Sequence, residues 1–394
     1  MRDVVIVNGA RTAIGNYLGA LSEFNAVELG KIVLQAAIDR AGIDKSLVQE
    51  VICGHVNQAG APGNSARHIA MGIGLPVESF AFTVHQQCAS SMRAAELLSQ
   101  EIMLGKIDIG AVVGVESMSN APYLLFGARK GYRLGDGEQI QDSLMIGGLV
   151  DALLGYHMGV TAENIAEIYG ITREEQDRFA LMSHERACRA IKEGWFKEEI
   201  VPVEVKTKKG TAIFDTDEHP MPDTSMEKLS QLKPVFKKGG TITAGNASSL
   251  NDGGSALIMM AAETAKKMGI KPLARVVSSA PGSVEPRIMG MGVVAAVRNA
   301  LKFAGLSQDD IDYWEFNEAF AAQVLGVNRE LKVSLDRLNI VGSGISLGHP
   351  VGATGARLIV TLMNVLKRQN ARLGCAALCA SGGPAHAFII ELIK

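Results

Sequence analysis

The sequence has little net charge and lacks any long apolar run. Over 394 residues, 39 Lys and Arg are balanced by 41 Asp and Glu, giving a formal net charge of -2. Such a balance provides no basic surface of the kind that attracts nucleic acid or anionic membranes. No apolar stretch approaches the ~18 residues of a membrane span. The sequence therefore argues against both nucleic acid and a membrane as partners.

Cysteines are few, odd in number and scattered. The five lie at positions 53, 88, 188, 375 and 379. They do not form a disulfide framework, so we expect a reducing compartment and a cytoplasmic location. The N-terminal segment Met1–Val7 is typical of a first strand rather than a signal peptide. Cys375 and Cys379, taken with Cys53 and His55, match no common zinc spacing, so we predict no metal site.

Expected strands and helices alternate along the N-terminal and the C-terminal parts of the chain. Hydrophobic residues make up 47% of the sequence and glycine is frequent, at 43 residues. The alternation predicts an α/β fold in which mainly parallel sheets are covered on both faces. The element order is similar in the two halves, which indicates a duplication. The expected strands are 4–7, 51–56, 80–84, 109–115, 275–277, 313–316, 376–378 and 387–390, and the expected helices are 26–41, 89–104, 172–193, 293–304 and 353–369.

The pattern changes in the middle of the chain. Between residues 120 and 246 the segments become irregular and richer in Gly, Met and charge. We interpret this region as an inserted loop domain on an α/β scaffold. The predicted organisation is an N-terminal half over 1–119, completed by about 247–270, the insertion over 120–246, and a C-terminal half over 271–394.

Cys88 lies between an expected buried strand over 80–84 and the helix that follows it. The strand over 109–115 completes a βαβ unit. A helix N-terminus favours an anion, so we expect a thiol there to ionise more easily. A lone cysteine is nevertheless more often a buried structural residue.

Three turns in the second half carry further reactive side chains. They contain Asn317, His349 and Cys379, each at the end of an expected element, where α/β folds expose ligand-binding groups. Singly, each residue has a structural explanation: a helix cap, a core histidine and a small apolar residue. The Gly-rich loop 342–348 departs by one residue from the dinucleotide-binding pattern and is followed by no convincing acidic partner, so it is a weak candidate for that role.

Taken together, these motifs resemble the thiolase family over nearly the whole chain. The spacing is most similar to that of the acetyl-CoA acetyltransferase, or acetoacetyl-CoA thiolase, branch. The segments that carry the resemblance are Asn8–Thr12, Gly114–Ser119, His157–Asn164, Thr243–Ser248 and the turns at Asn317, His349 and Cys379.

The resemblance implies a role for each reactive residue. Cys88 is the nucleophile that becomes acylated, and His349 takes its proton. Cys379 is the second acid or base, acting on the carbon acid. His349 and a water held by Asn317 stabilise one oxyanion, and the backbone N–H groups of Cys88 and Ser381 stabilise the other. No metal or redox cofactor is required.

The resemblance also implies a substrate class. His157, Met158 and Ser248 match positions that contact the pantetheine or its surroundings, and Met289 and Phe320 match positions that line the acyl pocket. The expected reaction is the reversible condensation of two acetyl-CoA to acetoacetyl-CoA plus CoA, through acyl-Cys88. Members of this family form dimers or tetramers, so we expect a homotetramer or a homodimer.

Several positions depart from the family pattern, and three of them bear most on this assignment. Ser91 and Ser381 stand where glycine is usual, and serine at 381 is strained if the backbone there needs φ above zero. Met221 stands where arginine is frequent, so a charge near the nucleotide is missing.

Three alternatives remain at this stage. One is a degradative 3-ketoacyl-CoA thiolase of broader specificity, which a chain-length rate profile separates from the acetyl-specific enzyme. Another is a non-catalytic acyl-CoA-binding relative, disabled by the changes at Ser91 and Ser381. The last is a redox-responsive protein with a reversible Cys88–Cys379 disulfide, although such a sensor needs neither Asn317 nor His349.

Overall fold

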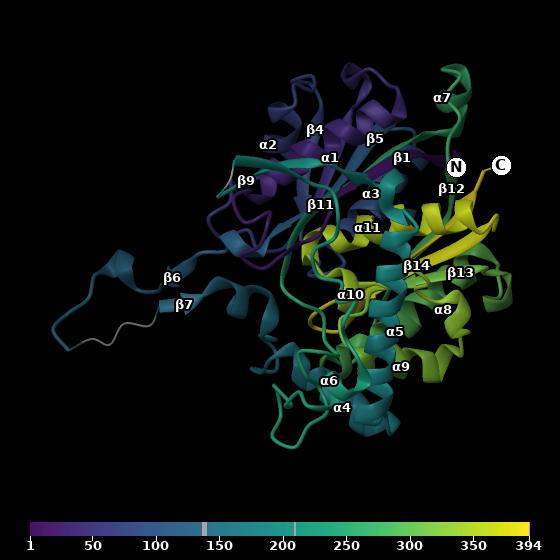
Figure 1. The fold of residues 1–394 in the computed structure, drawn as a ribbon. Helices are drawn as coiled ribbons and strands as arrows, with labels where there is room; N and C mark the ends of the chain where they lie inside the picture. Colours follow the sequence, from purple (N-terminus) through teal and green to yellow (C-terminus); the bar gives the residue numbers. More distant parts are fainter. Residues whose placement is uncertain (136–139, 209, 394) are drawn as a thin grey trace.

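The computed structural model describes residues 1–135, 140–208 and 210–393, so the predicted insertion includes five residues (136–139 and 209) outside the described part. Strands and helices alternate along both ends of the chain (Figure 1). The strands are β1 Val4–Thr12, β2 Gly15–Asn16, β3 Glu50–His55, β4 Phe80–Val84, β5 Ile109–Ser117, β6 Tyr123–Leu125, β7 Ile140–Asp142, β8 Ile200–Val201, β9 Val203–Thr207, β10 Gly210–Phe214, β11 Asn251–Ala261, β12 Ala274–Ser283, β13 Tyr313–Phe316, β14 Leu373–Cys379 and β15 Pro384–Leu392. The α-helices are α1 Ala26–Ala41, α2 Ser65–Gly72, α3 Ser90–Met103, α4 Met158–Tyr169, α5 Arg173–Lys192, α6 Met226–Ser230, α7 Ala262–Lys267, α8 Gly292–Ala304, α9 Ala321–Leu331, α10 Gly344–Leu347 and α11 Val351–Arg368.

One sheet runs through both halves of the molecule. Its order is β13-β14-β15-β12-β1-β11-β5-β3-β4, with β2 beside β11 and β8 beside β1. Pairing is parallel at the two ends, between β13 and β14 and among β5, β3 and β4. The central pairs from β14–β15 to β11–β5 are antiparallel. Parallel pairing thus follows the crossover helices, as predicted. Strand β15 is antiparallel to β14 because a short turn joins them, whereas β11 returns antiparallel to β5 after the whole inserted segment.

The helices divide the sheet into layers. Helices α3 and α11 pack against each other and lie between the two halves of the twisted sheet (Figure 1). Helices α1 and α2 cover the outer face of the N-terminal half, and α8 and α9 cover that of the C-terminal half. The strand order is β1-β11-β5-β3 in one half and β12-β15-β14-β13 in the other, so the expected duplication is visible in the topology.

Local signals in the sequence placed several helix ends correctly. The side chain of Asn25 and that of Glu28 form a capping box at the start of α1, and Gly42 ends this helix at φ 64°. Thr172 and Glu175 form the same box on α5. Each box satisfies N–H groups that the first helical turn leaves without partners.

Two of the differences from the predicted strands concern strands of the central sheet. The strand β4, expected to be buried, is the outermost strand of the sheet, and Phe80 on it is 69% exposed. The buried strand β11 was not expected, because its first residues, Asn251–Ser255, are polar or glycine and hide the apolar run that follows.

The middle segment has two parts. One part, around β6 and β7, projects from the body as a long arm (Figure 1). The other carries α4, α5 and the hairpin β9–β10 and is anchored to β1 by a buried cluster, in which Arg11 Nε lies 2.7 Å from Glu199 Oε1 and Arg11 Nη1 lies 2.7 Å from Asp217 Oδ1. Among the described helices, none is long and apolar enough to cross a membrane.

Candidate active site

A cavity of about 610 Å³ opens where the inserted segment meets the two halves. It brings together residues that lie far apart in the sequence. The predicted site residues on its wall are Cys88, His157, Met158, Ser248, Met289, Phe320, His349 and Ser381. Asn317 and Cys379 are not on the wall and lie behind it, 1% and 2% exposed.

The duplicated topology brings the reactive groups together. Cys88 lies in the turn between β4 and α3, and His349 lies two residues before α11. The N-termini of the two central helices therefore meet at the cavity. The turn at Cys88 is strained, since Gln87 has φ 49°, a conformation that residues other than glycine rarely adopt. Cys379 ends β14, and Asn317 directly follows β13.

Cys88 is a neutral thiol in this environment. Burial raises the pKa of Cys88, the nearby Cys379 raises it further, and the Cys88 N–H only partly offsets this. The expectation that the helix N-terminus makes this thiol ionise easily is therefore wrong. The cost of burying the thiolate outweighs the helix dipole.

Hydrogen bonds orient the imidazole of His349. Its Nδ1 lies 2.7 Å from Thr354 Oγ1, and that hydroxyl donates to the Pro350 carbonyl at 2.9 Å. Because the hydroxyl proton is used on Pro350, Thr354 accepts from His349, which places the ring proton on Nδ1. Burial, helped by Arg357, lowers the pKa of His349 to about 3. His349 is thus a neutral base with its lone pair on Nε2.

Asn317 approaches this lone pair from behind the cavity wall. Its Nδ2 donates to His349 Nε2 at 3.3 Å, and its Oδ1 has no hydrogen-bond partner within the described residues. The pairing of Asn317 with His349 was predicted from the resemblance, and the structure brings the two side chains together. The water assigned to Asn317 stays a prediction.

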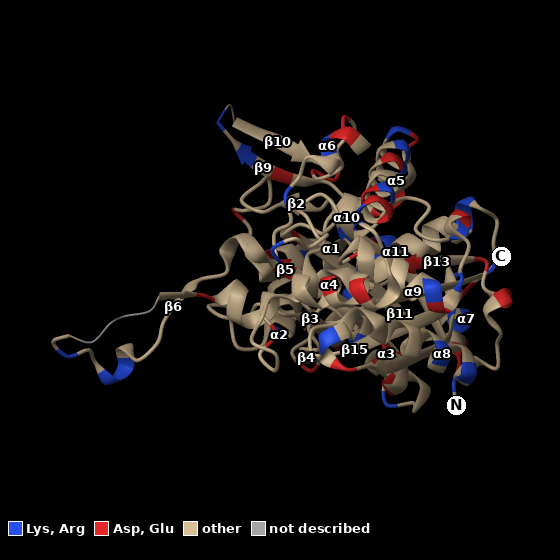
Figure 2. Ribbon diagram, turned by 90° about the horizontal axis from the view of Figure 1, so that it is seen from below, with Lys and Arg blue, Asp and Glu red and all other residues tan. Residues whose placement is uncertain are grey.

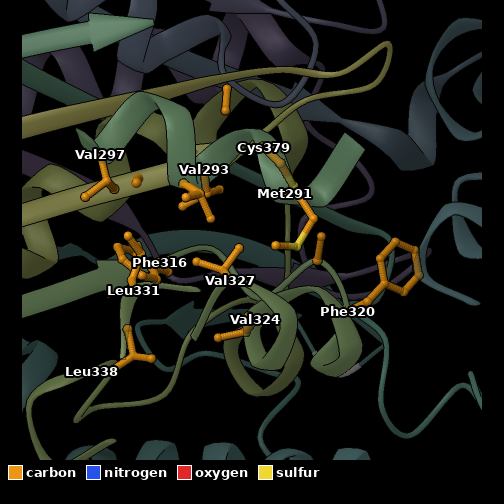
Figure 3. Close-up of a cluster of buried hydrophobic side chains, with 14 of the residues drawn as sticks. Met291, Val293, Val297, Phe316, Phe320, Val324, Val327, Leu331, Leu338 and Cys379 are labelled. Carbon is orange, nitrogen blue, oxygen red and sulfur yellow. The ribbon is translucent and has the colours of Figure 1, made fainter. Parts of the chain in front are cut away.

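Cys379 lies at the end of the C-terminal hydrophobic core. Figure 3 shows it in the same cluster of buried apolar side chains as Met291, Phe320 and residues of α8 and α9. Burial raises the pKa of Cys379 to about 12. Both thiols are therefore protonated near neutral pH unless another group takes their protons.

Ser381 lies in a tight turn between β14 and β15. Gly383 N donates to the Ala380 carbonyl at 3.3 Å, and the positive φ angles fall on Gly382 (88°) and Gly383 (100°). Ser381 itself is not at positive φ. The strain considered for serine at this position is therefore absent.

Ser91 has a packing role between the central helices. It is buried, and its Oγ accepts a hydrogen bond from Ala356 N at 3.0 Å, which links α3 to α11. The hydroxyl thus joins the helices that follow Cys88 and His349.

Aromatic rings line part of the cavity wall. His157 caps α4, accepting from Gly159 N at 3.0 Å, and its ring stacks on Phe236 at 4.4 Å between centroids. Phe236 meets Phe320 edge-on at 6.1 Å. Phe236 was not singled out in the sequence, because no local pattern connects it with these two residues.

A second cavity, of about 600 Å³, adjoins the first. The two share His219 and Ala244 on their walls, and Met221 lines the outer one. Met221 is exposed there, and its place near the nucleotide of CoA stays a prediction.

Two supporting residues of the histidine were also missed. Thr354 fixes the tautomer of His349, and Asn251 Oδ1 accepts from the His349 backbone N at 2.8 Å. The threonine lies on α11, where its spacing from the histidine gives no recognisable motif.

In the described part of the chain, no group of three or more His, Cys, Asp or Glu side chains could hold a metal ion.

Fold and site define a layered α/β protein with two thiols and a neutral histidine around one apolar cavity. Residues 4–263 match the family model of the thiolase N-terminal domain, and residues 270–392 match that of the thiolase C-terminal domain. The chain therefore belongs to the thiolase family, and the predicted membership and fold class are confirmed.

Relatives resemble the chain over its full length. It is 48% identical to an acetyl-CoA acetyltransferase of Syntrophomonas wolfei and 48% identical to one of Escherichia coli, with 100% of each chain covered in both cases. The structure of human mitochondrial 3-ketoacyl-CoA thiolase superposes with a TM-score of 0.97 at 39% identity, covering 100% of this chain and 99% of that one.

Proposed function

We propose that the protein is an acetyl-CoA C-acetyltransferase, which joins two acetyl-CoA into acetoacetyl-CoA plus CoA and catalyses the reverse thiolysis. The observation that carries this proposal is the neutral His349, which lines the same cavity as Cys88, with Cys379 buried behind the cavity wall. The 48% identity to relatives named acetyl-CoA acetyltransferase supports the acetyl specificity. CoA thioesters are substrates, and no further cofactor is needed.

The first half-reaction acylates Cys88. As Sγ attacks the thioester carbonyl, the thiol proton passes to His349 Nε2. The imidazolium then has an N–H at Nε2 in place of the lone pair. Its Nδ1–H still donates to Thr354 Oγ1. Cys379 protonates the departing CoA thiolate. The site is left with acetyl-Cys88, a Cys379 thiolate and the His349 imidazolium, so atoms and charge balance.

The second half-reaction forms the carbon–carbon bond. The Cys379 thiolate removes a proton from the methyl group of a second acetyl-CoA, and the imidazolium stabilises the enolate oxygen. The enolate carbon attacks the acetyl carbonyl, the bond to Cys88 breaks, and Cys88 recovers its proton from His349. The N–H groups of Cys88 and Ser381 are assigned to the oxyanion on the acyl carbon. Both thiols end protonated, as their raised pKa values require.

Coenzyme A is proposed to extend from the reactive cavity into the adjoining one. The pantetheine would pass His157, Met158 and Ser248, while Met289 and Phe320 close the acyl end. The structure of a human mitochondrial 3-ketoacyl-CoA thiolase in complex with CoA, with a TM-score of 0.96 and 38% identity, supports a CoA site on this fold.

We also propose a homotetramer, with a homodimer as the smaller alternative. Two separate apolar surfaces support it, and a tetramer built from twofold interfaces needs two of them. One is the edge strand β4 with its exposed Phe80 and Phe82. The other is the projecting arm with exposed Tyr123 and Leu125, where Lys and Arg also gather (Figure 2).

We also propose a cytoplasmic location. All five cysteines are free, which supports it.

Thiolysis tests the proposed function. Purified protein is mixed with acetoacetyl-CoA and CoA, and loss of the 3-ketoacyl-CoA absorbance is followed, with longer 3-ketoacyl-CoA substrates alongside. We expect the highest kcat/KM for acetoacetyl-CoA. A maximum at longer chains would instead favour a degradative 3-ketoacyl-CoA thiolase, and CoA binding without turnover of any substrate would favour a non-catalytic relative.

A further inference from the structure

Asp151 is a buried carboxylate beside the site that the reaction above does not use. It is 1% exposed and lies in the inserted segment, at the start of a tight turn. Its backbone N donates to the Tyr156 carbonyl at 2.9 Å, and the flanking residues Val150 and His157 form an antiparallel bridge. The turn that Asp151 opens therefore leads directly into His157 on the cavity wall.

The two carboxylate oxygens face different parts of the molecule. Oδ1 accepts from Leu153 N at 2.8 Å and from Leu154 N at 3.2 Å, which closes the turn of the insertion. Oδ2 accepts from Gly382 N at 3.0 Å and lies 3.5 Å from Ser381 Oγ. Asp151 thus joins the inserted segment to the Ser381–Gly382 turn, which belongs to the C-terminal half.

The contact with Gly382 fixes the orientation of one peptide group. Ser381 and Gly382 are the central residues of the turn, and a positive φ at the second of them defines type II. Rotation of the peptide between them would convert the turn to type I and point the Ser381 carbonyl at the Asp151 carboxylate. Two acceptors repel each other, so Asp151 favours the observed orientation, in which the N–H points at it.

We propose that Asp151 is a positioning residue for acyl transfer: by accepting from Gly382 N it anchors the backbone directly after Ser381, whose own N–H is assigned to the oxyanion of the acyl carbon. This inference rests on the proposed function. The Ser381 hydroxyl acts as a second donor to the Asp151 carboxylate, and a glycine at position 381 would lack this donor.

The test replaces Asp151 by Asn. The asparagine side chain has the shape of the aspartate but only one acceptor oxygen. Its NH₂ group must therefore face either the Leu153 and Leu154 N–H groups or the Gly382 N–H, which are all donors. We expect a kcat for thiolysis reduced on the order of tenfold or more, below the loss of about 10²–10³ that follows removal of an oxyanion donor itself, with KM within about threefold of the parent value. Ser381→Ala should reduce kcat less, and the double variant should be no slower than Asp151→Asn.

Asp142→Asn is the matched control. Asp142 Oδ1 accepts from Leu144 N at 2.8 Å within the same inserted segment, and this carboxylate is not among the partners of the 380–383 turn. A readout that needs no oxyanion site, alkylation of Cys88 by iodoacetamide, should keep its parent rate in Asp151→Asn.

The outcomes separate the two claims. An active parent whose Asp151→Asn variant keeps its kcat would overturn the positioning role, as would parallel loss of alkylation and turnover, which indicates general damage. An inactive parent would instead overturn the proposed function. Loss of kcat with alkylation retained, and with Asp142→Asn unaffected, supports the role.

Discussion

At the residue scale, burial controls the chemistry of the site. It lowers the pKa of His349 to about 3 and raises that of Cys379 to about 12, so the resting site contains a neutral base and neutral acids. Charges then exist only during turnover, as the His349 imidazolium and the Cys379 thiolate of the acetyl-enzyme. The sequence predicted which side chains take part, but it suggested a preformed thiolate at Cys88, because the helix N-terminus is visible in a sequence and the depth of burial is not.

The raised pKa of Cys88 predicts how its alkylation depends on pH. Only the thiolate reacts, and below the pKa its fraction grows about tenfold per pH unit. We therefore expect the rate with iodoacetamide to rise steadily from pH 6 to pH 9 without a plateau. The modified residue is identified by peptide mass spectrometry, with Cys88→Ala correcting for the other thiols. A plateau beginning below pH 8 would mean that the free enzyme does stabilise the thiolate.

Removal of the Thr354 hydroxyl should make His349 a poorer base. In Thr354→Val, nothing fixes the His349 proton on Nδ1, and the tautomer with the proton on Nε2 cannot accept from Cys88. We expect kcat to fall about tenfold or more. Thr361→Val is the control, because Thr361 lies on the same helix and contacts Glu199 at 3.3 Å, away from the cavity. Equal kcat values in the two variants would rule out this role of Thr354.

At the element scale, two helix N-termini and three strand ends assemble the site. Periodicity, capping boxes and glycine stops gave the bounds of α1, α3, α5, α8 and α11 to within about two residues, because these signals are local. The antiparallel return of β11 and the exposure of β4 depend on pairing between distant segments, which no local pattern records. The same holds for Phe236 and Asp151, whose partners lie far along the chain.

The crossing of α3 and α11 predicts a stability effect. A methyl group added at Gly355 would lie 2.4 Å from the Met92 nitrogen, so the two helices would have to separate. We expect Gly355→Ala to lower the free energy of unfolding by about 1–3 kcal/mol, as overpacking commonly does. Denaturant unfolding measures this, with Gly63→Ala as control, since a methyl group there meets no atom within 4 Å. Equal stability of the two variants would contradict close packing at this crossing.

At the scale of the whole molecule, the projecting arm and the open sheet edge are the two surfaces that we propose as contacts between copies of the chain. Both expose large side chains to water, which isolated proteins generally avoid. Leu125 and Ile140 are paired on the arm, 44% and 66% exposed. We therefore expect the arm to be covered by another copy of the chain.

A charge on the arm should reduce the size of the assembly. Leu125→Glu places a carboxylate in the proposed contact, while β6 and β7 keep their pairing. We expect light scattering after size exclusion to give a tetramer for the parent and a dimer for the variant. A monomeric parent, or a variant of unchanged mass, would contradict the assignment of the arm.

Acetylation of the enzyme by acetyl-CoA alone tests the central claim most directly. The parent, Cys88→Ala and Cys379→Ala are each incubated with acetyl-CoA, quenched in acid and mapped by peptide mass spectrometry. We predict that the acetyl group is found on Cys88 in Cys379→Ala, where the second half-reaction is blocked, and that Cys88→Ala remains unlabelled at the site. An acetyl group on Cys379, or no acetyl-enzyme in any form, would contradict acyl transfer through Cys88.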